Sequence, residues 1–178
     1  MAAARARWGV RRGEHGFTLL EILVTLAVIG ILAAVAIPGF FKESRKSRAQ
    51  TEVSSMFAEL ATREEQYKID NGTYLASPAC PATPTGALQA LTACLASAEW
   101  IALRVVAPES QVYCSYDVVI GNAGVDPTPP AGFTLPTSPA IGWYYVHALC
   151  DMDGSSTLNA EYLQSNLDTT IQSLNPGY

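Results

Sequence analysis

An uncharged run of 20 residues, from Ile22 to Phe41, constrains the fold of this chain more than any other feature. Sixteen of the 20 residues are hydrophobic, and the other four are Thr25, Gly30, Pro38 and Gly39. As an α-helix rising about 1.5 Å per residue, the run is about 30 Å long, which is the thickness of the hydrocarbon core of a bilayer. Three structures fit such a run: a transmembrane anchor, a secretory signal peptide and a buried core helix.

A secretory signal peptide fits the run less well than a membrane anchor does. Ala34-Val35-Ala36 has the A-x-A pattern that precedes signal cleavage, which would follow Ala36. However, the apolar stretch is longer than the usual hydrophobic region of about 7–15 residues, and a carboxylate, Glu21, interrupts the apolar residues at its start. Cleavage after Ala36 therefore stays as the alternative to an anchor.

Charge is distributed unevenly on the two sides of this run. Residues 1–16 have four arginines and one glutamate, residues 42–70 have six basic and six acidic side chains, and residues 71–178 have one basic and eight acidic side chains. The net charge of −5 argues against general nucleic-acid binding, which requires a basic face. Four basic residues precede the run and four follow it closely, so charge alone does not orient it in a membrane.

The residues around the start of the run resemble the processing site of type IV prepilins and of the related pseudopilins of type II secretion. A short basic leader ends at Gly16, the next residue is Phe17, and Glu21 is the fifth residue after that junction. The similarity continues through Ile29-Gly30-Ile31-Leu32-Ala33-Ala34-Val35-Ala36-Ile37-Pro38. The resemblance implies that prepilin peptidase cuts between Gly16 and Phe17 and that the new amino group of Phe17 is methylated.

Glu21 and Pro38 have roles that this resemblance implies. In the family, the glutamate pairs with the amine of a neighbouring subunit during assembly; the alternative is that Glu21 only reaches to the membrane interface. Pro38 removes one backbone hydrogen bond from a helix, and we expect a kinked but continuous helix there. The alternative is a helix that ends at Ile37.

Residues 42–70 have the pattern of an amphipathic helix. Apolar side chains recur at helical spacing and predict one face that packs on the chain's own sheet: Ala49, Val53, Met56, Leu60 and Tyr67. The opposite face, with Glu52 and Glu59, is expected to be solvated. Residues 17–69 together predict one helix of about 80 Å, which a domain of this size is too small to cover. Its N-terminal half is therefore expected in a membrane or among other subunits.

Residues 71–178 predict a head of antiparallel strands, so the fold class is α+β: a long N-terminal helix packed on a small antiparallel sheet, as in pilins. We expect a loop over 75–92 and a short helix over 87–96. Strands are predicted over Trp100–Val106, Val112–Ile120, Gly142–Leu149 and Thr157–Gln164. A long Pro-rich loop over 121–140 is expected to be functional or mobile.

The cysteines, at positions 80, 94, 114 and 150, all follow the apolar run. If that run is an anchor, they lie outside the cytoplasm, where disulfides persist. Four cysteines allow three pairings. We favour Cys80 with Cys94, which closes a short loop, and Cys114 with Cys150, which links two strands; free buried cysteines are the alternative.

The sequence gives little support for a metal site or for catalysis. Asp151 and Asp153 begin like a calcium loop, but the later ligands lack the required spacing, so these two residues are only weak candidates. No cofactor is expected. His147 has no apparent catalytic partners, and we expect no enzymatic activity.

The sequence thus predicts a leader (1–16), a transmembrane and filament-core helix (17–41), an amphipathic stalk helix (42–70) and a globular head (71–178). The resemblance implies a type IV pilus subunit that spans the bacterial inner membrane once, with its head outside the cytoplasm, before entering an extracellular or periplasmic filament. Its implied partners are other pilin subunits, prepilin peptidase, the inner-membrane assembly machinery and membrane lipid. The alternatives are a type II secretion pseudopilin and a signal-anchored periplasmic domain that never polymerises.

Overall fold

The computed structural model describes residues 17–155 and 157–178. The predicted leader, including Gly16, lies outside the described residues. The chain divides after Gly39 into two compact units, and the second unit runs from Phe40 to Tyr178. The predicted stalk segment thus belongs to the same compact unit as the β-sheet.

One long helix, α1, runs from Leu19 to Asn71 and contributes to both units. It begins two residues after the expected position, because Thr18 accepts hydrogen bonds from the first turn. It does not end at Ile37, since the helical backbone continues through Pro38 and Gly39. It stops at Asn71, followed by Gly72 with φ +79°, a left-handed conformation that suits glycine.

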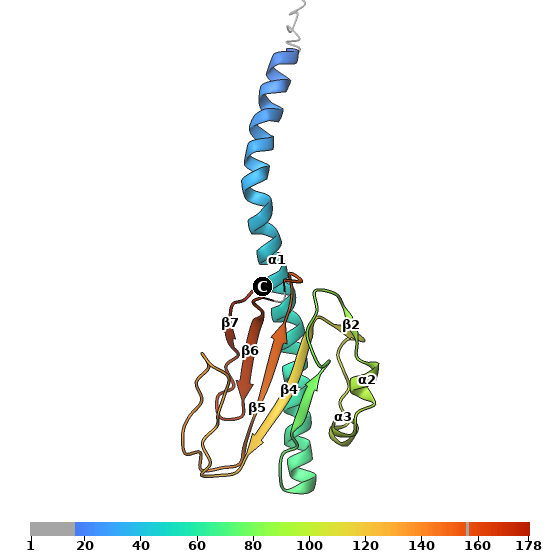
Figure 1. Ribbon diagram of the computed structural model, residues 1–178, viewed down its shortest axis with the longest axis vertical. Coiled ribbons are helices and arrows are strands. Elements are labelled where there is room, and N and C mark those ends of the chain that lie inside the picture. The colour runs from blue at the N-terminus through green and yellow to red at the C-terminus, as the bar shows by residue number, and fades with distance from the viewer. Residues whose placement is uncertain (1–16, 156) are drawn as a thin grey trace, which may run out of the picture. The chain divides into compact units, whose positions relative to one another are not determined.

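The main sheet has five antiparallel strands, ordered β1-β4-β5-β6-β7 (Figure 1). They are β1 (Ser77–Cys80), β4 (Cys114–Gly121), β5 (Trp143–Cys150), β6 (Ala160–Ser165) and β7 (Gln172–Leu174). A separate two-stranded sheet pairs β2 (Gln89–Ala90) with β3 (Gln111–Val112). The α+β class expected from the sequence is confirmed.

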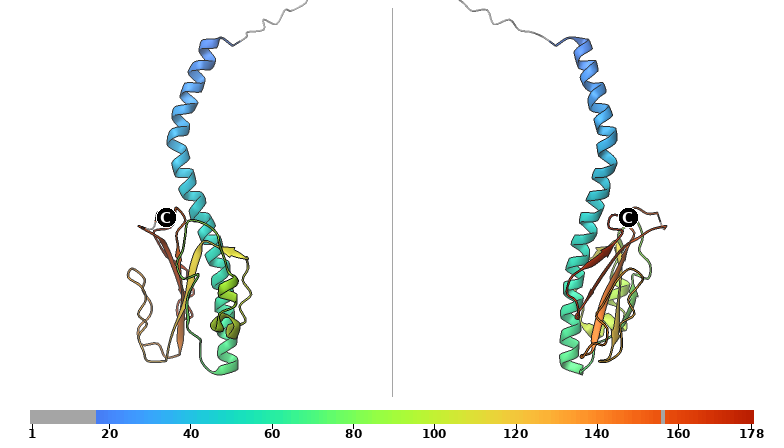
Figure 2. Two further views of the ribbon diagram at one scale, coloured as in Figure 1. Left: turned by 45° about the vertical axis from the view of Figure 1, so that its right-hand side comes forward. Right: turned by 90° about the vertical axis from the view of Figure 1, so that its left-hand side faces the viewer.

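One face of the sheet packs against the second half of α1 (Figure 2). The helix buries the predicted apolar stripe, apart from Tyr67, which is only partly buried: Ala49, Val53, Met56 and Leu60, together with Phe57. The sheet buries Tyr116, Val118, Val146, Ala148 and Tyr162 in the same cluster. The 3.6-residue period of the helix and the two-residue period of the strands bring these side chains into one core.

The opposite face of the sheet is covered by the Pro-rich loop between β4 and β5. Phe133 of this loop is buried with Trp143, Tyr145 and Leu163 of the strands. Trp143 Nε1 donates to the Val125 carbonyl at 2.8 Å, and Tyr145 donates its hydroxyl to the Thr128 carbonyl at 3.3 Å. The loop expected to be functional or mobile is therefore a packed cover for the sheet.

The segment around Trp100 corrects one prediction, because it is a helix and not a strand. α3 runs from Ala98 to Leu103, and the Ser97 hydroxyl accepts from the Trp100 amide at its start. Trp100 and Leu103 are buried at a helical spacing of three, whereas Ile101 is 61% exposed. The alternation of apolar residues that predicted a strand is thus coincidental.

Smaller differences concern the segments on either side of this helix and the end of the chain. α2 covers only Thr92–Leu95, within the predicted helix over 87–96. β1 and β2 lie within or beside the segment expected to be a loop, and β7 has no sequence counterpart. These strands have two to four residues, which is too short for an alternating pattern to predict.

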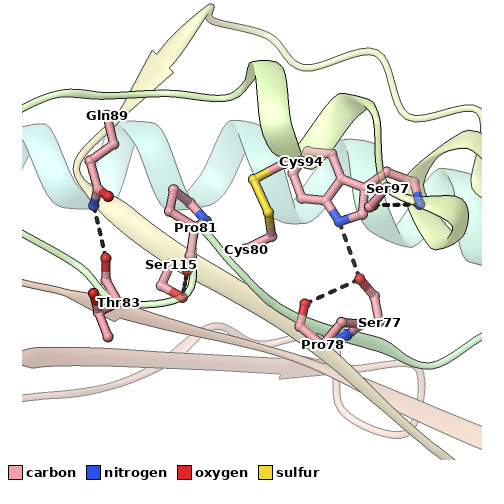
Figure 3. Close-up of a disulfide and its surroundings, with 10 residues drawn as sticks. Ser77, Pro78, Cys80, Pro81, Thr83, Gln89, Cys94, Ser97 and Ser115 are labelled. Carbon is pink, nitrogen blue, oxygen red and sulfur yellow. Dashed lines mark hydrogen bonds between the residues drawn. A yellow bond between two sulfur atoms is a disulfide. The ribbon is translucent and has the colours of Figure 1, made fainter.

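Two disulfides join Cys80 to Cys94 and Cys114 to Cys150, which is the favoured pairing. Cys114 and Cys150 are directly opposite each other on β4 and β5. Figure 3 shows the Cys80–Cys94 bond beside Ser77 and Ser97. The buried Trp100 indole donates to the Ser77 hydroxyl at 3.2 Å, so the disulfide, β1 and α3 meet at one place.

Candidate assembly surface

The first part of α1 exposes an apolar surface. Every large hydrophobic side chain between Phe17 and Phe41 is exposed. The helix is long and apolar enough to cross a membrane, judged by length and composition alone. Exposed apolar area of this extent marks a lipid-facing or protein-binding surface.

Glu21 and Phe17 lie at the start of this surface. Phe17 and Thr18 precede the helix, and the Thr18 hydroxyl accepts a hydrogen bond from the Glu21 amide at 3.2 Å. Glu21 is in the first helical turn, where a carboxylate interacts favourably with the helix dipole. The T-x-x-E sequence from Thr18 to Glu21 has the spacing of a capping box, which is a local signal for the start of a helix. Glu21 therefore takes part in the N-terminal cap of α1, in addition to its implied role in assembly.

Two glutamates of α1 that were expected to be solvated instead bind loops of the head. The Glu52 carboxylate accepts from the amides of Tyr113 and Cys114 and from the Tyr116 hydroxyl, at 2.9–3.1 Å. Glu59 Oε1 accepts from the Val106 amide at 2.8 Å and from Arg63 at 2.7 Å. Apart from Arg63, these partners are 47 to 64 residues away in the sequence, so the helical pattern alone does not predict them.

A third carboxylate, Glu64, is buried completely, with 0% of its surface exposed. Its Oε2 accepts from the Leu75 amide at 3.0 Å, whereas Oε1 has no hydrogen-bond partner among the described residues. Burial raises the pKa of Glu64 to about 7, even though the Leu75 amide acts in the opposite direction, and nearby Glu65 raises the pKa further. Glu64 is therefore a neutral carboxylic acid in much of the accessible pH range.

His147 lies on the face of the sheet that the Pro-rich loop covers. Its Nδ1 is 3.0 Å from Asp117 Oδ1, and its Nε2 is 3.6 Å from Glu161 Oε2. Burial lowers the pKa of His147, but the hydrogen bond and charge of Asp117, with a contribution from Glu161, raise it above the ordinary value. His147 is therefore held between two carboxylates, and the arrangement is an ion pair when the imidazole is protonated.

Asp151 and Asp153 use their carboxylates within the turn between β5 and β6. Asp151 Oδ1 accepts from the Gly154 amide at 2.6 Å, and Asp153 Oδ1 accepts from the Ser155 amide at 2.9 Å. Within residues 17–155 and 157–178, no group of three or more His, Cys, Asp or Glu side chains is arranged to hold a metal ion. These bonds account for the two aspartates as turn-forming residues.

Comparison with known proteins assigns a family to the N-terminal part of this surface. Residues 11–37 match the family described as the prokaryotic N-terminal methylation motif. The chain is also 40% identical over 81 residues to type II secretion system core protein G of Klebsiella michiganensis, covering 46% of this chain and 51% of that protein. It is 40% identical over 68 residues to the type IV wide pilus major component PilA4 of Thermus thermophilus, covering 38% and 51%. The chain is thus similar to type IV pilins and to type II secretion pseudopilins.

The similarity to these proteins is confined to part of each protein. Core protein G of Dickeya chrysanthemi is 37% identical over 65 residues, which cover 36% of this chain and 42% of that protein. The chain therefore spans about half the length of the curated relatives it matches. No solved structure is significantly similar to it.

Proposed function

We propose that this protein is a structural subunit of a type IV pilus. The observation that carries the proposal is the first part of α1, whose large hydrophobic side chains are all exposed and whose first turn contains a single carboxylate. A polymer buries this surface among copies of the same helix, and the hydrophobic effect then supplies most of the energy of assembly. The proposed role is structural, and no catalytic step is assigned to the chain.

In this proposal, the leader 1–16 is removed by prepilin peptidase between Gly16 and Phe17, and the amine of Phe17 is methylated. Before assembly, residues 17–41 span the inner membrane once and contact lipid. The head is outside the cytoplasm, a compartment in which the two disulfides persist. Inner-membrane machinery then transfers the subunit into the filament.

Mass spectrometry of the protein purified from its membrane and filament fractions tests the processing step. The expected N-terminus is Phe17 with one added methyl group. An N-terminus at Ile37 indicates signal-peptide cleavage after Ala36 and overturns the proposal, as does an intact leader on assembled protein.

A second candidate function is that of a type II secretion pseudopilin, which the similarity to the core G proteins favours. Deleting the gene separates the two functions. Loss of surface filaments with normal protein secretion supports a pilin, whereas loss of secretion without loss of surface filaments supports a pseudopilin. If the deletion affects neither surface filaments nor secretion, and the wild-type subunit stays monomeric in the membrane, the protein is an anchored domain that does not polymerise.

A further inference from the structure

The helix α1 has an open cavity on one side, at the point where the uncharged run of the sequence ends. The cavity has a volume of about 560 Å³ and is lined by Phe40, Phe41, Ser44, Arg45 and Arg48. This volume is within the range of about 300–1,000 Å³ that is usual for small-molecule sites. The two phenylalanine rings are exposed and are in edge-to-face contact, with their centroids 6.4 Å apart. Two apolar rings thus adjoin two guanidinium groups.

The two arginines of this cavity donate no hydrogen bond and form no ion pair within residues 17–155 and 157–178. Arg45 is only partly exposed, and its Nε is buried without an acceptor. By contrast, the nearby Lys46 has its Nζ 3.6 Å from Glu43 Oε1. A buried donor without an acceptor is costly, and the planar fork of guanidinium donors matches the oxygens of a phosphate. The arginines therefore suit an anion that supplies these acceptors.

Carboxylates of the head lie near both arginines but do not accept their hydrogen bonds. Burial acts to raise the pKa of Asp153, whereas hydrogen bonds within its turn and the positive charge of Arg45 lower it, with the net effect that the pKa is lowered. Arg48 lines a second cavity together with Glu52 and Glu109, but the Glu52 carboxylate accepts hydrogen bonds from β4 and the residue before it. The chain thus attracts the two guanidinium groups without saturating them.

The helical rise places these arginines at the depth of lipid headgroups. Arg45 is four residues beyond Phe41, where the uncharged run ends, and Arg48 is seven residues beyond it, which correspond to about 6 and 10 Å along the axis. The headgroup region adds about 5–8 Å to each side of the hydrocarbon core. Helical side chains also lean toward the N-terminus of their helix, which here is the direction of the apolar run. Both guanidinium groups can therefore reach the phosphates of one leaflet.

The lining of the cavity favours an amphipathic anion over a small ion or an acidic side chain. A phospholipid supplies phosphate oxygens to the arginines and acyl chains to the two phenylalanine rings. Inorganic phosphate, or a carboxylate from a second copy, satisfies only the arginines and leaves the rings in water. Residues 42–48 contain four basic side chains and one acidic side chain, so their net charge of +3 favours a lipid with a net negative charge.

We propose that this cavity binds the phosphate group of an anionic phospholipid while the subunit is in the membrane, with Arg45 and Arg48 as the phosphate ligands. The inference rests on the proposed membrane span of residues 17–41, but it does not depend on polymerisation. A subunit that leaves the bilayer for a filament must release this lipid, so anionic lipid and assembly compete for the same part of α1.

A photo-crosslinking residue in place of Ser44, which lines the cavity, tests the proposal in the full chain. The protein is reconstituted into nanodiscs with equal amounts of phosphatidylglycerol and phosphatidylcholine, and mass spectrometry identifies the adducts at position 44. Phosphatidylglycerol adducts should exceed phosphatidylcholine adducts at least fivefold. Arg45→Gln combined with Arg48→Gln should bring the ratio close to one, whereas Arg104→Gln, at an exposed arginine of the head, should leave it unchanged. A ratio that is the same in the double variant and in wild type overturns the proposal.

Further arms of this experiment distinguish the other sources of an anion. Added inorganic phosphate should leave the lipid adducts unchanged, and their loss would show a site for a free ion, which overturns the proposal. Adducts on a second copy in place of lipid overturn it as well. If the double variant reconstitutes poorly, Arg48→Gln alone, at an exposed position, should still lower the ratio at least twofold. A chain that does not enter nanodiscs at all contradicts the proposed membrane span itself, which separates the two failures.

Discussion

At the scale of single residues, three buried or half-buried carboxylates determine how the head is attached to α1. Glu52, Glu59 and Glu64 each accept a backbone amide from a different segment of the head. An amide that leaves water requires an acceptor, and an ionised carboxylate is the strongest acceptor that a side chain offers. Glu64, when protonated, still accepts through Oε2. Where segments of the head cross α1, these glutamates therefore accept the backbone hydrogen bonds that a neighbouring strand would accept within a sheet.

Substituting Glu52 should destabilise the head. Glu52→Ala leaves the amides of Tyr113 and Cys114 and the hydroxyl of Tyr116 without their acceptor, at a cost of about 2–4 kcal/mol. Urea denaturation of the mature protein in detergent measures the change. Glu43→Ala, at an exposed position of the same helix, serves as the control. A loss of unfolding free energy smaller than that of Glu43→Ala would show that water replaces the Glu52 carboxylate.

Glu64 should make stability depend on pH in an unusual direction. Its folded pKa of about 7 lies above the ordinary value of 4.5, so the folded state holds the proton more tightly than the unfolded state. The stabilisation is therefore complete below about pH 4.5 and is lost as pH rises through 7. Glu64→Gln should remove this dependence and be more stable than wild type at pH 8. Denaturation midpoints between pH 4.5 and 8 measure it, with Glu43→Gln, at an exposed position of the same helix, as control. Parallel wild-type and Glu64→Gln curves contradict the prediction.

The contrast between Glu21 and Glu52 shows what the sequence predicts at this scale. Glu21 is conspicuous because a carboxylate is rare in an apolar stretch. Glu52 is an ordinary glutamate on the polar face of an amphipathic helix, and its partners are more than 60 residues away. Residue type and spacing reveal the first glutamate, whereas only the tertiary fold reveals the role of the second.

At the scale of elements, the sequence predicts the long, strongly periodic segments well. α1 and the strands β4, β5 and β6 follow the expected apolar patterns. The errors occur where an element is short, as in α3, whose six residues are compatible with either period. The packing of the covering loop was not predicted for a different reason. Proline content indicates an irregular backbone, but it does not indicate whether that backbone packs on the sheet.

The start of α1 allows the two roles of Glu21 to be separated. Glu21→Ala should leave membrane insertion intact and impair filament assembly strongly, since it removes the charge proposed to pair with a neighbouring amine. Thr18→Ala removes the hydroxyl that accepts from the Glu21 amide, and it should affect assembly much less. Membrane fractionation and filament yield are the measurements. Wild-type filaments from Glu21→Ala would refute the pairing role.

The covering loop should depend on Phe133 as its buried anchor. Phe133→Ala removes a buried aromatic ring from the cluster with Trp143, Tyr145 and Leu163, with an expected cost of about 3 kcal/mol. Hydrogen exchange should increase throughout residues 122–142 while α1 and β4 stay protected. Replacement of Val125, which is exposed, provides the comparison. Unchanged exchange in the loop would show that the hydrogen bonds to Trp143 and Tyr145 hold it without the ring.

At the scale of the whole molecule, the proposed processing after Gly16 would change the charge of the subunit. Residues 17–178 contain 7 basic and 15 acidic side chains, for a net charge of −8, compared with −5 for the precursor. Seven of these excess negative charges belong to residues 71–178, so the proposed filament would bring acidic heads close together.

Salt should therefore promote association of the subunits. The Debye length falls from about 30 Å at 0.01 M to about 8 Å at 0.15 M ionic strength, so repulsion between heads is screened. The fraction of subunit that sediments as filament should rise over this range. Choline chloride in place of sodium chloride controls for specific cation effects. A fall in sedimented filament would indicate that attractive ion pairs between subunits outweigh the repulsion.

The three carboxylate attachments of α1 have a mechanical consequence for a filament under tension. A pull along the helix axis reaches the head through contacts at residues 52, 59 and 64, which join α1 to three separate segments of the chain. A pull along the axis loads these three contacts in shear. Because the contacts are loaded at the same time, they share the force and do not open one after another. The head would then resist extraction of its helix more strongly than the strength of any one of these bonds suggests.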